Sequence, residues 1–228
     1  MPVMNLQGQA LQDLLQALRN AARAAERPVP TLLAVSKTQP AEAVASLAAC
    51  GQRAFGENYV AEAVAKIVAL QALGLEWHLI GHLQSNKCRL VAEHFDWVQS
   101  LDRAKLIDAL DHWRPAERPP LNILIQVNAD GEAGKSGCRP EEILGLARAL
   151  NAAPKLRLRG LMAIPEPTPD FGQRRLTFRR LRGMFDQLAV EFPEIDTLSM
   201  GMSEDFALAV EEGATMVRVG TALFGPRT

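Results

Sequence analysis

The sequence lacks the features that mark secreted, membrane-bound or nucleic-acid-binding proteins. It has three cysteines, Cys50, Cys88 and Cys138, an odd number without the paired spacing of zinc or redox sites. No apolar run is long enough to cross a bilayer, and the N-terminus has no charged segment followed by an apolar one. The formal net charge of -1 gives no excess of positive charge for binding nucleic acid or anionic lipid. We therefore expect a cytoplasmic protein with reduced thiols, and with no nucleic acid or membrane among its partners.

Two further absences bear on the fold. No linker rich in Pro, Ser or Gly divides the 228 residues, and no Gly-x-Gly-x-x-Gly turn follows the first apolar segment. The chain has instead a regular alternation of short apolar segments and helical stretches. The segments that we predict as strands are rich in aliphatic or aromatic residues: 31–37, 53–56, 76–81, 96–100, 122–127, 156–164, 197–200 and 216–220.

Eight strands that are each followed by a helix or a helical turn predict one (β/α)8 barrel domain over residues 1–228. An amphipathic helix over about 5–26 precedes the first strand, and we expect the segment 1–27 to pack on the barrel. An open, doubly wound parallel sheet is the alternative, and the missing glycine turn disfavours it. In a barrel, functional residues lie where strands end and the following loops begin.

Lys37 closes the first predicted strand. A period of two places Leu33, Val35 and Lys37 on one face, so the amine leaves a packed interior at the carboxyl end of the strand. A lysine in this place can simply reach solvent, because lysines are rarely fully buried. It can also act as a nucleophile, if burial and a neighbouring positive charge lower its pKa.

Two loops late in the chain have features of a phosphate site. They cover 199–203 and 218–225 and follow the seventh and eighth predicted strands, where barrels often bind phosphate. Gly201 and Gly220 allow the backbone to approach an anion closely, and Ser203 is predicted to cap the next helix. Turn glycines and plain helix capping are the simpler interpretation of either loop alone.

Arg218 lies two residues before Gly220, on the same face of the last strand, and is predicted to point into the barrel mouth. A buried guanidinium needs an acceptor, either a rim carboxylate such as Glu57 or Glu166, or a ligand atom. With Lys37 and the two loops, Arg218 indicates a carbonyl-bearing phosphate ester held as a Schiff base. Pyridoxal 5'-phosphate (PLP) has the aldehyde, the phosphate and a ring nitrogen for the arginine.

Six segments, in order along nearly the whole chain, carry a resemblance to a known family: 34–37, 55–59, 77–84, 160–165, 199–203 and 217–220. By these segments the chain resembles the pyridoxal phosphate homeostasis proteins, which are related to the barrel domain of alanine racemase. The resemblance implies Lys37 as the Schiff-base lysine, Arg218 as the partner of the ring nitrogen, and phosphate contacts from Ser203, Gly220 and Thr221. The residues predicted to bind the cofactor are Lys37, Asn58, Ser199, Ser203, Arg218, Gly220 and Thr221.

The predicted activity is that of a carrier. The racemases that the chain resembles take one acid/base group from a second, C-terminal domain, and we expect that domain to be absent because the chain ends eight residues after Gly220. Tyr59 is not an evident replacement, and an arginine at the ring nitrogen weakens the cofactor as an electron sink. We therefore predict a monomer that holds PLP for intracellular homeostasis, by storage, buffering or delivery, and meets PLP-dependent apoenzymes transiently.

Two catalytic alternatives stay open beside the carrier. One is a PLP-dependent racemase or decarboxylase acting on an amino acid, and the other is a phosphate-sugar aldolase with a Schiff-base lysine. Lys87 and Lys135 lie in or near predicted rim loops, and each is either a solvated lysine or a second amine for the aldehyde. His78 and His82 are too far apart along a strand to share a metal ion, so we expect no metal site.

Overall fold

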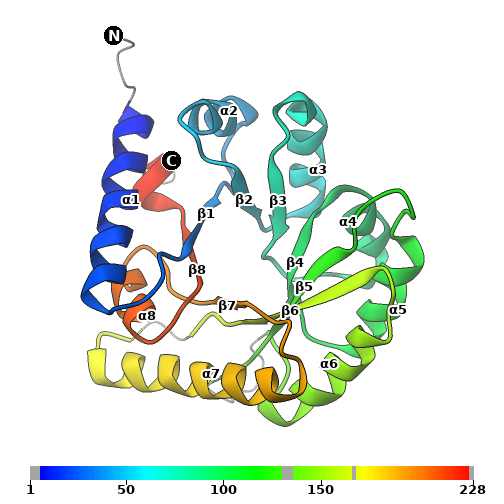
Figure 1. Ribbon diagram of the computed structural model, residues 1–228. Coiled ribbons are helices and arrows are strands. Elements are labelled where there is room, and N and C mark those ends of the chain that lie inside the picture. Colours follow the sequence, from blue (N-terminus) through cyan, green and yellow to red (C-terminus); the bar gives the residue numbers. More distant parts are fainter. Residues whose placement is uncertain (1–5, 130–135, 166–167, 226–228) are drawn as a thin grey trace.

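The strands of the protein close into a parallel barrel, seen along its opening in the computed structural model (Figure 1). The structure describes residues 6–129, 136–165 and 168–225. Each strand pairs in parallel with the next in the sequence, and β1 also pairs with β8, with Thr31 opposite Met216. The strands are β1 (Thr31–Val35), β2 (Ala54–Glu57), β3 (Glu76–Leu79), β4 (Trp97–Leu101), β5 (Leu121–Gln126), β6 (Leu156–Met162), β7 (Thr197–Ser199) and β8 (Met216–Val219).

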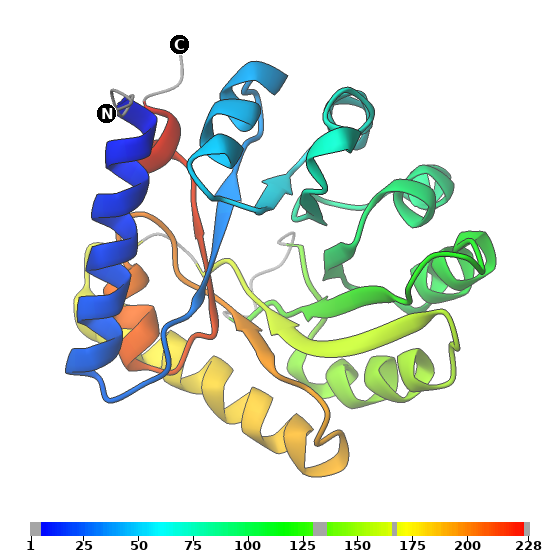
Figure 2. The ribbon, with the colours of Figure 1, turned by 45° about the horizontal axis from the view of Figure 1, so that its top comes forward.

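Helices surround the barrel and connect successive strands (Figure 2). The α-helices are α1 (Leu6–Ala24), α2 (Ala41–Ala49), α3 (Val60–Ala69), α4 (Cys88–His94), α5 (Ala104–Trp113), α6 (Ile143–Asn151), α7 (Phe171–Glu191), α8 (Phe206–Glu211) and α9 (Thr221–Phe224). The 3-10 turns are η1 (Gln71–Leu73), η2 (Ser85–Lys87) and η3 (Pro140–Glu142). The predicted (β/α)8 fold is confirmed, and the open-sheet alternative is wrong because β1 and β8 pair.

The alternation of side chains along the strands divides the apolar residues between two layers. One face of each strand joins the large cluster between the sheet and the helices, to which β1 contributes Leu32 and Ala34. The other face fills the barrel, where Leu33 of β1 packs in a cluster with Ile80 and Met216. Leu33 is fully buried and Val35 partly buried, so the face that leads to Lys37 points into the barrel as predicted.

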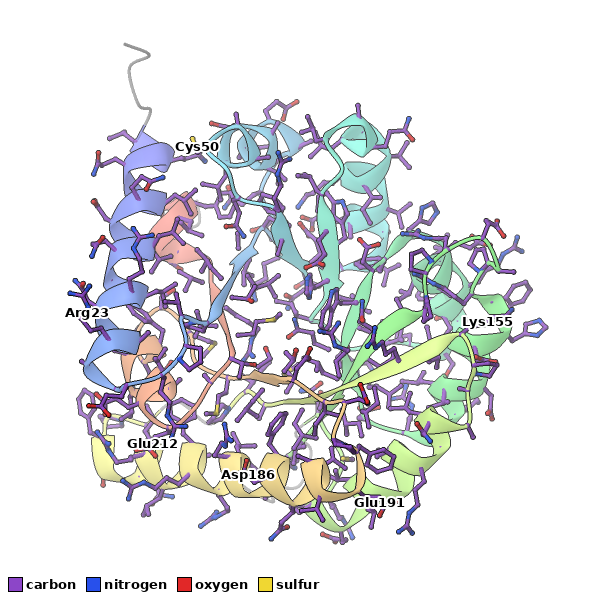
Figure 3. The ribbon with its side chains drawn as sticks, viewed as in Figure 1. Arg23, Cys50, Lys155, Asp186, Glu191 and Glu212 are labelled. Carbon is purple, nitrogen blue, oxygen red and sulfur yellow. The ribbon has the colours of Figure 1, made fainter. Side chains whose placement is uncertain are left out.

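Ion pairs join the outer helices to one another. Glu212, just after α8, accepts from Arg175 and Arg179 of α7 at 2.9 and 3.0 Å. At the other end of α7, Glu191 pairs with Arg148 of α6 at 2.8 Å (Figure 3). Both views of the ribbon place α1 beside α8 and α9, against which it packs. The arginines of α7 are therefore largely paired rather than displayed as a basic surface.

The start of α8 differs from the sequence-based prediction. Ser203 does not cap α8, because the helix begins at Phe206 with Asp205 as its N-cap residue. Asp205 instead accepts a hydrogen bond from the backbone N–H of Met202 at 2.6 Å, which closes the turn that contains Ser203.

Three predictions concern the whole chain: its relation to membranes, its division into domains and its location. None of the helices in the part of the chain that the structure describes has the length and hydropathy to span a bilayer. The prediction of a single domain over 1–228 includes terminal residues outside the described ranges, and it stays a prediction. The cytoplasmic location stays a prediction as well.

Candidate functional site

A cavity of about 160 Å³ opens at the carboxyl ends of the strands, where β7, β8 and β1 meet. Its polar lining comes from Lys37 after β1, Ser203 after β7, Arg218 in β8 and Thr221 in α9. Its apolar lining includes Ile80 and Ile164 at the ends of the neighbouring strands. The residues that line it are Val35, Lys37, Gln39, Asn58, Ile80, Ile164, Met202, Ser203, Arg218, Gly220, Thr221, Phe224 and Gly225.

A buried ionic cluster lies directly behind the turn that carries Lys37. The amine of Lys66 donates to the backbone oxygen of Ser36 at 2.7 Å and to carboxylate oxygens of Glu57 and Glu62 at 2.7 and 2.6 Å. The Ser36 hydroxyl also donates to Glu57 at 2.6 Å. Burial raises the pKa of Glu57, while Lys66 and Ser36 act in the opposite direction. The residue before Lys37 is therefore fixed by a lysine on α3.

The same cluster holds the far side of the Lys37 turn. The backbone N–H of Thr38 donates to Glu62 at 2.7 Å, and Thr38 has a φ of 63°. A left-handed backbone is strained for a β-branched residue, so surrounding contacts must fix it. Lys37 thus lies between two residues anchored by the Lys66 cluster, and its own side chain is partly buried in the cavity wall.

Close backbone approach explains the glycines of the two loops that were predicted to bind phosphate. A Cβ at Gly201, whose φ is 89°, would lie 2.5 Å from the Cβ of Ala209, and a Cβ at Gly220 would lie 3.1 Å from the oxygen of Val35. Glycine at 220 therefore lets β8 run close to β1 at the cavity. The backbone N–H of Arg218 donates to the oxygen of Gly201 at 3.1 Å, which ties the loop after β7 to β8.

Arg218 is buried beneath the cavity and bonded on two sides. One terminal nitrogen, Nη1, donates to the hydroxyl of Ser199 at 2.8 Å, and the other, Nη2, donates to the backbone oxygen of Ala163 at 2.8 Å. Burial lowers the pKa of Arg218 to about 10, so the group stays charged at neutral pH. Of the carboxylates considered as partners, Glu57 pairs with Lys66, and Glu166 lies outside the described residues.

Six of the seven residues predicted to bind a cofactor line this one cavity, and they are Lys37, Asn58, Ser203, Arg218, Gly220 and Thr221. The seventh, Ser199, is fully buried and contacts Arg218 instead. The side-chain oxygen of Asn58 is buried with no hydrogen-bond partner among the described residues. A buried amide without a partner is costly, so Asn58 leaves a polar group for a ligand.

The weaker candidates of the sequence lie elsewhere. Lys87 is a partly buried residue of η2 that does not line the cavity, and Lys135 lies outside the described residues. The His82 ring, half exposed, is 4.0 Å from Asp102, whereas His78 is fully buried in the barrel. Within the described ranges, no group of three or more His, Cys, Asp or Glu side chains is placed to hold a metal ion.

The sequence resembles one family model and a large set of curated proteins. Residues 9–228 match the family described as alanine racemase, N-terminal domain. A pyridoxal phosphate homeostasis protein of Haemophilus influenzae is 55% identical over 200 residues, which is 86% of this chain and 84% of that protein. The protein of the same name from Pseudomonas aeruginosa is 55% identical over 212 residues, 92% of this chain and 91% of that one.

The chain belongs to the pyridoxal phosphate homeostasis proteins of the alanine racemase N-terminal domain family. The barrel of this family is also found in solved structures. PipY of Synechococcus elongatus without PLP has a TM-score of 0.86 and 38% identity, over 96% of this chain and 99% of that one. PipY with PLP bound has a TM-score of 0.83 and 37% identity over 96% and 100% of the two chains.

Sequence analysis did not identify the residues that hold Arg218 at the cavity. Gln99 of β4 and the backbone oxygen of Ala163 belong to the surroundings of Arg218, and neither was a candidate. A signal for Gln99 existed, because it shares a face with Trp97 in a strand that is otherwise apolar on that side. The carbonyl of Ala163 gave no such signal, since every residue has one.

Proposed function

We propose that this protein binds PLP as a Schiff base on Lys37 and holds it for the PLP homeostasis of the cell. The observation that carries the proposal is the meeting of Lys37, Arg218, Ser203 and Thr221 at one cavity. An amine, a guanidinium and two hydroxyls supply the nucleophile and the hydrogen-bond donors that an aldehyde-bearing phosphate ester needs. PLP binding in PipY and the names of the curated relatives support the choice of ligand.

The proposed residues each have a defined task. Lys37 would hold PLP through a C=N bond between its amine nitrogen and the aldehyde carbon, and the carbonyl oxygen would leave as water with the two hydrogens of the amine. Ser203 and Thr221 donate to the phosphate, and Gly220 keeps the backbone accessible beside it. The charged guanidinium of Arg218, which lines the same cavity, would donate a hydrogen bond to the ring nitrogen.

The lining of the cavity favours a carrier over an enzyme. Among the lining residues within the described ranges, the ionisable side chains are those of Lys37 and Arg218. An arginine does not release its proton at neutral pH, so it cannot serve as the second acid or base of a racemase. Tyr59 is 60% exposed and is not part of the lining. We therefore propose storage, buffering or delivery by a monomer, with transient contact to PLP-dependent apoenzymes.

Reductive trapping tests this proposal directly. The purified protein is incubated with PLP, freed of excess cofactor, reduced with borohydride, digested and analysed by mass spectrometry. We expect visible absorbance before reduction and a reduced adduct on the peptide that contains Lys37, because borohydride converts an imine to a stable amine. An adduct found chiefly on Lys87 or Lys135 would contradict the site. Racemisation or decarboxylation of an amino acid at about 1 per second or faster would contradict the carrier.

Ser203→Ala tests the phosphate contact separately. The variant is expected to hold PLP about 1–2 kcal/mol more weakly, the scale of one hydrogen bond to a charged group. Its measured quantity is the rate at which PLP passes to an excess of a pyridoxal scavenger. Ser46→Ala on α2, away from the cavity lining, is the matched control and should leave that rate unchanged. Equal rates of PLP transfer from the two variants would contradict the assignment of Ser203 to the phosphate site.

A further inference from the structure

A continuous line of hydrogen bonds crosses the interior of the barrel beneath the cavity. It starts at Nη1 of Arg218, which donates to the Ser199 hydroxyl at 2.8 Å. The Ser199 hydroxyl donates to Oε1 of Gln99 at 2.8 Å, a bond that spans the barrel from β7 to β4. Gln99 Nε2 lies 2.9 Å from Nδ1 of His78, and Nε2 of His78 lies 2.8 Å from Oε1 of Glu76.

With a neutral His78 ring, the chemistry of the groups gives this line one direction. A guanidinium only donates, so the Ser199 oxygen accepts a hydrogen bond from Arg218. The Ser199 hydroxyl in turn donates a hydrogen bond to Gln99. The Gln99 amide nitrogen only donates, so Nδ1 of His78 must accept. The ring proton then lies on Nε2 and is donated to the carboxylate of Glu76. Every bond points from the cation of Arg218 toward the anion of Glu76.

Both polar atoms of the Gln99 side chain have hydrogen-bond partners. Besides His78, its amide nitrogen has Sδ of Met216 at 3.1 Å, while its oxygen accepts from Ser199. If the Gln99 amide were rotated by 180°, its oxygen would face the sulfur of Met216. Nδ1 of the His78 ring, whose Nε2 is bonded to Glu76, would then have no donor. His78 is fully buried and stacks on Trp97 with ring centroids 5.0 Å apart, and these contacts restrict rotation of the ring.

We propose that Gln99, acting through Ser199, is a positioning residue for Arg218. Its oxygen fixes the direction of the Ser199 hydroxyl, and the serine oxygen in turn presents its lone pairs to one side of the guanidinium. Ala163 fixes the other side through its carbonyl. Two of the five N–H donors of Arg218 are used in this way, and the residue whose plane they fix also lines the cavity.

Fixing Arg218 in advance favours ligand binding because arginine is a flexible side chain. A free arginine side chain loses considerable rotamer freedom when a ligand orders it, and that loss weakens binding. Here the loss occurs during folding, because burial and the line of bonds order Arg218 before any ligand arrives. The inference on ligand retention rests on the proposed PLP function, whereas the orientation of Gln99 and His78 does not.

The first test uses the protein without cofactor. In nitrogen-15 NMR spectra of the wild type, His78 is expected as a neutral ring protonated on Nε2, and burial supports this by lowering the pKa of the ring. Gln99→Met, which keeps the length of the side chain but lacks the amide, should release Nδ1 and change the His78 signals. A wild-type ring protonated on Nδ1, or on both nitrogens, would overturn the direction of the line and with it the role of Gln99.

The second test is a double-mutant cycle on PLP retention. Gln99→Met is expected to release PLP roughly tenfold faster than the wild type, the effect of losing an outer partner of a ligand-binding group. In an Arg218→Met background, the same change should alter the release rate by less than about twofold, because Gln99 acts through the arginine. Equal effects of Gln99→Met in both backgrounds would overturn the proposal and leave a merely structural glutamine.

Gln52→Met is the matched control for removing a buried glutamine. The Gln52 amide donates to the backbone oxygens of Leu32 and Ala54 at 2.9 and 2.7 Å and lies outside the cavity lining. It should lower the melting temperature as Gln99→Met does, yet leave the rate of PLP release unchanged. A wild type that fails to bind PLP would reject the proposed function, while the NMR result would still decide the orientation of Gln99.

Discussion

Lys37→Ala is expected to abolish the visible absorbance of the protein after incubation with PLP, because alanine has no amine to form a C=N bond. The barrel should stay folded, since Lys37 lies in a turn after β1 and adds little to the apolar clusters. Noncovalent binding through Ser203, Thr221 and Arg218 should persist, weaker by at least about 100-fold. Absorbance after gel filtration and a PLP titration measure the two quantities.

A second variant separates covalent from electrostatic effects of this lysine. Lys37→Arg keeps the positive charge in the cavity but replaces the nucleophilic amine by a guanidinium. It should lose the absorbance as completely as Lys37→Ala. Lys87→Ala, outside the cavity lining, is the control and should retain the wild-type spectrum. Full absorbance in Lys37→Ala would mean that another amine carries the cofactor.

Lys66→Met is expected to cause the largest loss of stability, about 3–5 kcal/mol in the free energy of unfolding. The lysine is 5% exposed and pairs with Glu57, which is fully buried, so its removal leaves an uncompensated carboxylate in the interior. It also removes the bond to the backbone oxygen of Ser36, next to Lys37. Urea denaturation measures the first effect, and PLP titration of the folded variant measures the second.

The loss of stability in Lys66→Met should be smaller at low pH than at high pH. Burial already raises the pKa of Glu57, and Lys66 opposes that rise, so the variant should have a still higher pKa at this carboxyl. A carboxyl whose pKa is higher in the folded than in the unfolded state stabilises the fold below the unfolded value, and this contribution is lost as pH rises through the folded value. The deficit of Lys66→Met should therefore be smaller at about pH 5 than at about pH 8.

Lys105→Met is the control for removing a lysine from a helix. Lys105 is exposed on α5, and the change should alter stability by less than about 0.5 kcal/mol. If Lys66→Met cost as little as this control, the Lys66 cluster would not be what fixes the Lys37 turn. Restoring stability by the double change Lys66→Met and Glu57→Leu would agree with a penalty from the unpaired buried charge.

Sequence reasoning was most successful where the physical signal is local. An aliphatic segment between polar or glycine residues predicts a strand buried on both faces, and β1 and β5 lie within or close to their expected limits. Strand order follows from sequence order in a barrel, so the neighbours of Lys37 at the mouth could be predicted as well.

Details that depend on several distant segments could not be predicted. Ser203 is a suitable N-cap residue by type, yet the helix begins later because Asp205 closes the preceding turn. The contact of Ser199 with a cofactor stays a prediction, and the position of its hydroxyl between Arg218 and Gln99 was not predicted. The distance from β4 to β7 across the barrel depends on strand tilt and on every side chain inside it. No pattern along one strand contains that information.

The pairing of β1 with β8 has a consequence for the order in which the molecule can be assembled. Lys37 follows the first strand, whereas Arg218 and Gly220 belong to the last, so the cavity has no partial form in an incomplete barrel. During synthesis, the site can arise only after the last strand has left the ribosome and closed the sheet, a contact of very long sequence separation. A ligand that bridges these strands binds the closed barrel alone and opposes its opening at this seam.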